Sequence, residues 1–156
     1  MPRIKPDEAR KERPPEGEGD PHGLGSYEAV LFSDAGGLTQ FGAFVETLHP
    51  GSRSSRQHWH ETEDEFIYML SGEVVLLEDD RESVLVAGDA ATFRAGTPLA
   101  HCLHNRAAAP ASYLVVGTRS DHDVVHYRDD GSRLERQGRR RTVRDATGAV
   151  IRTYER

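Results

Sequence analysis

The chain has 156 residues and a net charge of −6, which is enough for one domain with a single hydrophobic core. It contains no apolar run long enough to cross a membrane, and its first twenty residues lack the apolar centre of a secretory signal. The only cysteine, Cys102, excludes an internal disulfide framework and fits a reducing compartment. We therefore expect a cytoplasmic protein.

Charge is unevenly distributed along the chain. Residues 26–127 carry six Lys/Arg against fifteen Asp/Glu, whereas residues 128–156 carry nine Arg against five acidic residues. The acidic central part argues against a nucleic-acid surface. The run Arg139, Arg140, Arg141 is typical of a solvated tail, although it could also grip an anion or the acidic face of a partner.

The first 25 residues contain five prolines, four glycines and eleven charged residues, so they cannot bury enough apolar surface to offset the entropy of ordering. We expect residues 1–25 to form an extended or disordered arm. Organised structure should begin at Tyr27, with a strand over 27–32, a turn at 34–37 and a long strand over 38–48.

Short strands with turn signals every eight to twelve residues follow, which is typical of an all-β sandwich or barrel. No segment before residue 120 has a helical period. The expected strands are 56–60, 65–70, 73–77, 83–86, 90–93, 100–105 and 112–117. A barrel over residues 26–127 is then followed by an Arg-rich extension, 128–156, whose last part suggests a hairpin around residues 146–148.

Candidate metal ligands gather between Gly51 and Gly72. In a strand, His58 and His60 point to the same side with Cα atoms about 6.6 Å apart, so both imidazoles can reach one ion. The four residues after His60 can turn the chain back and place Glu65 at the start of the neighbouring strand, beside the histidines. A third imidazole would complete a mixed nitrogen and oxygen set, which suits Fe, Mn, Ni, Cu or Zn better than Ca or Mg.

These residues resemble the two motifs of the cupin superfamily. The first motif is a glycine, HxH, three or four residues, a glutamate, six residues and a glycine, and it is matched here by His58, His60, Glu65 and Gly72. The second motif is answered by Gly88, Gly96, His101 and Asn105. The resemblance spans about residues 38–119 and implies a double-stranded β-helix, or jelly-roll barrel, with a metal in its mouth.

The second motif departs from the usual pattern at two places. Arg94 stands where a proline is usual, and His101 lies two residues further from Gly96 than in the commonest form. His101 is therefore the expected fourth ligand, with His104 as its rival. Strand alternation favours His101, because it places His101, Leu103 and Asn105 on one face and His104 on the other.

The fold alone does not imply a reaction. Three functions remain open: a metal-dependent enzyme of oxygenase or isomerase type acting on a small oxyanion or carbonyl compound, a module that binds a sugar-like or carboxylate ligand without turnover, and a structural protein with an incidental metal. Open coordination positions and the absence of an output domain favour the enzyme. Gln57, Glu63, Tyr68, Arg94 and Asn105 are the candidates for supporting roles around the metal.

The strand at residues 65–70 also bears on assembly. Both of its alternating sets of side chains are largely apolar, so neither face suits water. One face would line the metal pocket and the other must be covered by another layer. Small cupins commonly form dimers through such surfaces, so the resemblance implies a homodimer.

Overall fold

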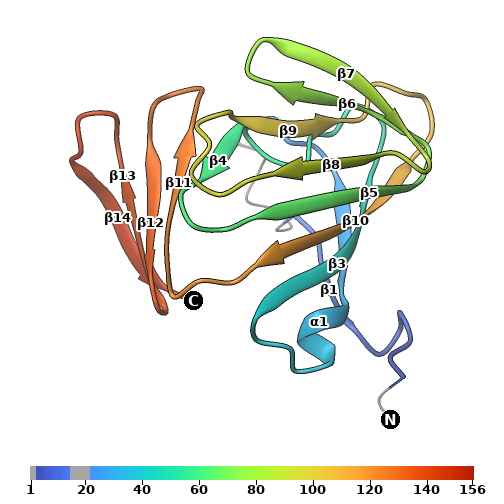
Figure 1. Ribbon diagram of the computed structural model, residues 1–156, viewed down its shortest axis with the longest axis horizontal. Coiled ribbons are helices and arrows are strands. Elements are labelled where there is room, and N and C mark those ends of the chain that lie inside the picture. The colour runs from blue at the N-terminus through green and yellow to red at the C-terminus, as the bar shows by residue number, and fades with distance from the viewer. Residues whose placement is uncertain (1–2, 15–21) are drawn as a thin grey trace.

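The computed structural model describes residues 3–14 and 22–156, and almost all of its regular structure is β-strand. Two antiparallel sheets face each other as a double-stranded β-helix, and the last strands extend from one side as a wing (Figure 1). This confirms the all-β barrel expected from the strand pattern and the jelly roll implied by the resemblance. The residues described contain no helix long and apolar enough to span a membrane.

One sheet has six strands in the order β1-β2-β3-β10-β5-β8. Its central strands, β3, β10 and β5, are also its longest, and their inward side chains supply much of the core. The bounds are β1 (Arg10–Glu12), β2 (Tyr27–Leu31), β3 (Phe41–Leu48), β10 (Ala111–Thr118), β5 (Glu65–Ser71) and β8 (Ala90–Phe93).

The other sheet has eight strands in the order β14-β13-β12-β11-β4-β9-β6-β7. Three pairings matter for the site: β4 lies between β11 and β9, and β9 pairs with β6. The bounds are β14 (Val150–Glu155), β13 (Arg140–Arg144), β12 (Arg133–Gln137), β11 (His122–Tyr127), β4 (His58–His60), β9 (His101–His104), β6 (Glu73–Glu78) and β7 (Arg81–Val86).

The hydrophobic core lies between the two sheets. It is built from alternate residues of facing strands, with Leu48, Met69 and Tyr113 among the largest fully buried side chains. Gly72 joins β5 to β6 with φ +73°, and a Cβ there would lie 2.8 Å from the backbone of Ala111. Only glycine fits both the left-handed backbone and this close approach, which explains its place in the motif.

Two segments outside the barrel form strands, and β13 and β14 pair as the suggested terminal hairpin. Arg140 and Arg141 belong to β13, which pairs with β12 and β14, so the Arg run does not form a solvated tail. Within the expected arm, residues 10–12 form β1 and pair with β2. Residues 1–2 and 15–21 of that arm lie outside the described residues.

A single helical turn, α1 (Phe32–Ala35), departs from the expectation of strand and turn alone. The first strand ends at Leu31, one residue earlier than expected, and the chain then closes a turn in which the N–H of Gly36 donates to the carbonyl of Phe32 at 3.0 Å. Helical periodicity cannot be recognised in four residues, so sequence pattern alone had no signal for this element.

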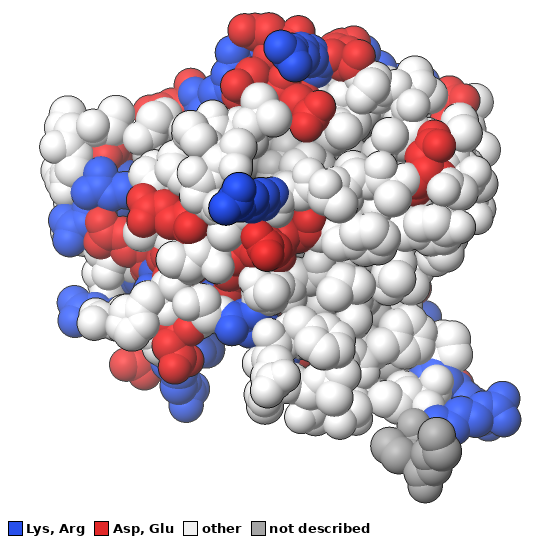
Figure 2. All heavy atoms as spheres, viewed as in Figure 1, with Lys and Arg blue, Asp and Glu red and all other residues white. Residues whose placement is uncertain are grey.

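The outer face of the six-stranded sheet is largely apolar over β5 and the middle of β3 and β10, whereas its edge at β1 and β2 carries Lys11 and Glu28. Its cross-strand register places Val30, Val45, Leu114, Tyr68 and Ala90 in one continuous row. A parallel row contains Ala43, Val116, Phe66 and Thr92. In Figure 2 the surface over β5 and β10 carries few charges, whereas charged side chains gather over the C-terminal strands and the β6–β7 hairpin.

Candidate metal centre

The side chains of His58 and His60 leave the same face of β4, as their spacing predicted. Trp59 points to the opposite side, where its ring stacks on His126 with centroids 4.2 Å apart. The two histidine rings meet edge to face with centroids 5.1 Å apart. β4 has only three residues, so its position depends on the neighbouring strands, β11 and β9.

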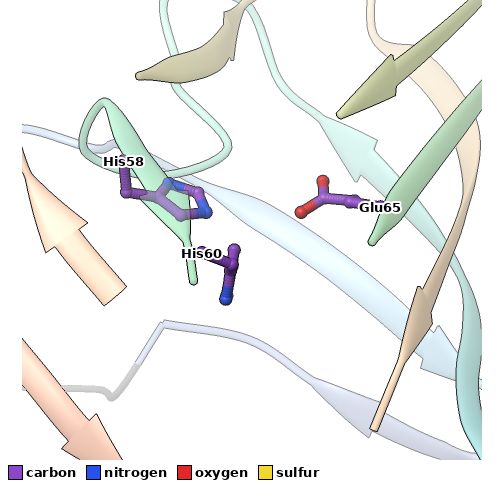
Figure 3. Close-up of side chains that lie close together, drawn as sticks. All are labelled: His58, His60 and Glu65. Carbon is purple, nitrogen blue, oxygen red and sulfur yellow. The ribbon is translucent and has the colours of Figure 1, made fainter. Parts of the chain in front are cut away.

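Glu65 is the first residue of β5 and faces the two histidines from the other sheet, as Figure 3 shows. One ligand atom from each of His58, His60 and Glu65 lies within 4.8 Å of the other two. Two imidazoles and a carboxylate at such separations can converge on one ion with only small side-chain movements, because metal–ligand bonds are about 2.1 Å long.

His101 reaches the same place from β9, where it lies directly opposite His58. Its Nε2 is 3.7 Å from Oε2 of Glu65, and its ring centroid is 4.9 Å from that of His58. The other side of the ring stacks on Phe93 at 3.5 Å. Both ring nitrogens are buried, and neither has a hydrogen-bond partner among the described residues. A buried polar atom without a partner is costly, and a metal ion would remove that cost at one of them.

The hydrogen bonds of the other two histidines leave the correct nitrogen free for a metal. Nδ1 of His58 lies 2.9 Å from the carbonyl of Arg56, and Nδ1 of His60 lies 2.6 Å from Oδ2 of Asp123. Both partners are acceptors, which assigns the proton to Nδ1 and the lone pair to Nε2 in each ring. The remaining carboxylate oxygen of Asp123 accepts hydrogen bonds from the N–H and the hydroxyl of Thr62, each 3.0 Å long.

Electrostatics favour the metal-binding forms of His58 and Glu65. Burial, reinforced by His101, lowers the pKa of His58 to about 4, so this imidazole is neutral near pH 7. Burial would raise the pKa of Glu65, but the neighbouring His101, His58 and His60 hold it below its ordinary value. Neutral histidines and an ionised carboxylate are the protonation states that metal ligands require.

The cluster lies on the wall of a cavity of about 910 Å³ between the two sheets. Glu46 lines the same cavity and accepts a hydrogen bond from the hydroxyl of Tyr113. Burial raises the pKa of Glu46 to about 7, so this carboxyl group changes its protonation state near neutral pH. The cavity therefore combines a candidate metal site with a separate group that can exchange a proton.

His104, the alternative fourth ligand, has different surroundings from those of His101. His104 does not line the cavity; its Nδ1 accepts a hydrogen bond from Nε of Arg106 at 3.2 Å. Of the residues expected in supporting roles, Glu63 lines the cavity, and Arg94 lines a smaller pocket beside the cluster.

The other three expected supporting residues lie elsewhere. Gln57 bonds to the backbone of Asp79, and Asn105 bonds to the backbone of Leu48. Tyr68 is on the outer face of its sheet, 39% exposed.

Two residues of the site could not be found from motif spacing. Asp123 is brought beside His60 by the pairing of β11 with β4, and Glu46 reaches the cavity from β3. The only sequence signal for Glu46 is a carboxylate on the apolar side of a strand. The segment that carries His122 and His126 pairs with β4, and Asp123 is the residue that it contributes to the site.

Fold and site together define a jelly-roll protein with a three-histidine, one-glutamate cluster in its mouth. Residues 44–117 match the family model described as the Cupin domain. A crystal structure of a sugar phosphate isomerase from a cupin superfamily, from Silicibacter pomeroyi, is 32% identical with a TM-score of 0.88, and 97% of each chain is covered. The present chain belongs to the cupin superfamily.

Two further solved structures are similar. A protein from Acidithiobacillus ferrooxidans, for which sugar phosphate isomerase activity has been suggested, is 30% identical with a TM-score of 0.73, covering 83% of this chain and 82% of that one. A protein from Thermotoga maritima predicted to be an oxalate decarboxylase is 26% identical with a TM-score of 0.59, covering 75% and 98%. A search of curated proteins gave no match.

Proposed function

We propose that this protein is a metal-dependent isomerase of small phosphorylated carbonyl compounds, such as sugar phosphates. The observation that carries the proposal is the convergence of His58, His60, Glu65 and His101 on the wall of a large cavity that also holds Glu46. The two relatives that cover most of the chain at 30% identity or more support an isomerase rather than an oxygenase.

His58, His60, Glu65 and His101 would hold a divalent transition metal, one of Fe, Mn, Ni, Cu or Zn. The donor set fits such an ion, because His101 is buried with two unpartnered nitrogens and the other two imidazoles direct Nε2 away from their hydrogen-bond acceptors. When bound, the ion would polarise a carbonyl oxygen of the substrate as a Lewis acid. Asp123 holds the His60 ring in the orientation and tautomer that this role needs.

Glu46 is our candidate for proton transfer. Interconversion of an aldose and a ketose moves a proton from the carbon beside the carbonyl to the former carbonyl carbon, and moves the hydroxyl proton of that neighbouring carbon to the former carbonyl oxygen, so no oxidant or reductant is consumed. A base with a pKa near the working pH suits this step, and Glu46 has a pKa of about 7. The hydroxyl of Tyr113 fixes the carboxyl group in place.

Deuterium exchange tests the proposal directly. The full-length protein, loaded in turn with each of the five metals, is incubated in D₂O with a panel of aldose and ketose phosphates and followed by proton NMR. We expect exchange at the carbon beside the carbonyl together with appearance of the isomer, both abolished by the double substitution His58→Ala, His60→Ala. Absence of both exchange and isomer with every metal and substrate would rule out the isomerase, and isomer without exchange would argue against proton transfer through Glu46.

A binding protein without turnover is the alternative function. It is favoured if the metal-loaded protein binds one of these sugar phosphates tightly but exchanges no deuterium. Oxygen consumption with Fe(II) would instead point to the oxygenase class. A homodimer, a cytoplasmic location and the lack of a nucleic-acid partner stay predictions; the apolar outer face of the six-stranded sheet supports the dimer.

A further inference from the structure

Two arginines of the C-terminal strands face the same cavity as the histidine cluster. Arg136 in β12 and Arg141 in β13 are directly opposite each other in the strand register, and both line the cavity. The neighbouring Arg140 does not line it and is exposed. Like charges directly opposite each other destabilise a strand pair, so this arrangement calls for a compensating negative charge.

The carboxylates around the cavity neutralise only part of the positive charge of Arg136 and Arg141. Arg136 forms an ion pair with Glu63, but its Nε is buried without a hydrogen-bond partner among the described residues. Arg141 donates only to the carbonyls of Gly138 and Arg140, at 2.7 and 3.2 Å, and has no carboxylate partner in the described part of the chain.

Other arginines on the cavity wall differ in this respect. Arg10, Arg119 and Arg156 are each paired with Glu12 or Asp34. Burial lowers the pKa of Arg136, and the nearby charge of Arg141 lowers it further, in line with their opposed positions in β12 and β13.

The arginine pair is close to the candidate metal ligands. Glu63, the ion-pair partner of Arg136, also places its other carboxylate oxygen 3.9 Å from Nδ1 of His60. The N–H of Ser120 donates to Glu63 at 2.8 Å and helps to hold it between the two groups. One carboxylate therefore separates the guanidinium of Arg136 from a candidate metal ligand.

We propose that Arg136 and Arg141 form the subsite that binds the phosphate group of the substrate, while its carbonyl end lies at the histidine cluster. This rests on the proposed function for the identity of the substrate. A phosphate monoester carries a charge of about −1.5 to −2 near neutral pH and would neutralise both arginines. Guanidinium groups suit it because their N–H donors match the spacing of phosphate oxygens.

The test uses inorganic phosphate and the metal-free, full-length protein. Calorimetric titration at fixed ionic strength compares the unsubstituted chain with Arg141→Gln, with the matched control Arg140→Gln, and with the His58→Ala, His60→Ala variant. We expect Arg141→Gln to weaken phosphate binding by about tenfold or more, since a charge-assisted contact is lost. Arg140→Gln and the double histidine variant should bind as the unsubstituted chain does.

A second variant guards against loss of folding. Arg136→Lys retains the positive charge beside Glu63 but loses the planar guanidinium group. We therefore expect this variant to fold normally and to bind phosphate more weakly than the unsubstituted chain does. The proposal is overturned if the unsubstituted chain does not bind phosphate, if acetate binds as tightly, or if Arg140→Gln weakens binding as much as Arg141→Gln. Loss of binding only in the double histidine variant would likewise overturn it.

The result is independent of turnover, because no metal is present. Phosphate binding that depends on Arg141 in a protein without isomerase activity would sustain the subsite and reject the proposed function. Isomerase activity together with phosphate binding that the Arg141 substitution does not change would support the proposed function and reject the subsite.

Discussion

The Nδ1–H of His60 donates a hydrogen bond of 2.6 Å to the buried carboxylate of Asp123, although the two residues are 63 positions apart in the chain. Thr62 holds the same carboxylate with its N–H and its hydroxyl. Burial would raise the pKa of Asp123, but the hydrogen bonds from His60 and Thr62 keep it below its ordinary value. Asp123 is therefore a negative charge fixed behind a candidate metal ligand.

Replacing Asp123 should weaken metal binding without removing a ligand. We expect Asp123→Asn to lower the affinity for the metal about 10- to 100-fold, because the amide no longer fixes the tautomer and orientation of His60. Competition with a chelator measures the affinity, and Asp121→Asn, at an exposed position two residues earlier, is the control. Equal affinities for all three proteins would show that Asp123 does not support the metal site.

Asp123 could not be predicted from the sequence, whereas the four candidate ligands could. Local spacing was sufficient to predict that the side chains of His58, His60 and Glu65 lie close together, because strand alternation and one turn determine their relative positions. Strand alternation also favoured His101 over His104 as the fourth candidate ligand, because successive side chains of this four-residue strand point to opposite sides. These four residues depend on geometry within a strand or across one turn.

Residues supplied by long-range pairing could not be predicted. Asp123 reaches the site only because β11 pairs with β4, and the cavity position of Arg141 depends on β12 and β13 continuing the same sheet. The Arg run suggested a solvated tail because β13 carries charged residues on its exposed side, although it pairs with β12 and β14. Within this strand Arg140 faces solvent and Arg141 lines the cavity, and composition alone does not distinguish the two positions.

The choice between His101 and His104 can be tested by two single substitutions. His101→Gln should abolish or strongly reduce the metal content of the purified protein, because it removes one of four ligands. His104→Gln should leave about one ion per chain, since His104 does not line the cavity and bonds to Arg106. Elemental analysis of the two variants beside the unsubstituted protein measures this, and the opposite pattern would make His104 the ligand.

Glu46 should make stability fall as pH rises. Its pKa is raised from 4.5 to about 7 by burial, so between these values the folded state binds more protons than the unfolded state. Stability contributed by the protonated group is fully present below pH 4.5 and is lost as pH rises through about 7. The interval corresponds to about 3 kcal/mol of unfolding free energy.

Glu46→Gln should remove this dependence while keeping the hydrogen bond from Tyr113. Urea unfolding of the two metal-free proteins at several pH values between 4.5 and 8 gives the difference in stability, which should grow in favour of the glutamine variant as pH rises. His58 titrates in part of the same range with the opposite sign, but it is common to both proteins and largely cancels in the difference. Parallel stability curves would contradict a raised pKa for Glu46.

The homodimer was predicted from the two apolar faces of β5. Substitutions on the outer face of this strand can test it. Phe66, Tyr68 and Leu70 are 38%, 39% and 46% exposed, and they continue rows of Val, Leu and Ala across the six-stranded sheet. Exposed apolar patches of this continuity mark interaction surfaces, and an antiparallel sheet with an apolar outer face is stabilised when a second layer covers it.

Tyr68→Lys should convert the dimer into a monomer, because a second copy would have to bury the added charge, whereas the isolated chain leaves that position in water. Light scattering after size-exclusion chromatography gives the mass of each species. Val84→Lys in β7, at a position 59% exposed on the other sheet, is the matched control and should remain dimeric. If the unsubstituted chain is already a monomer at concentrations of tens of micromolar, the outer face is not a stable interface between two copies, since interfaces of standard size are typically stable at this concentration.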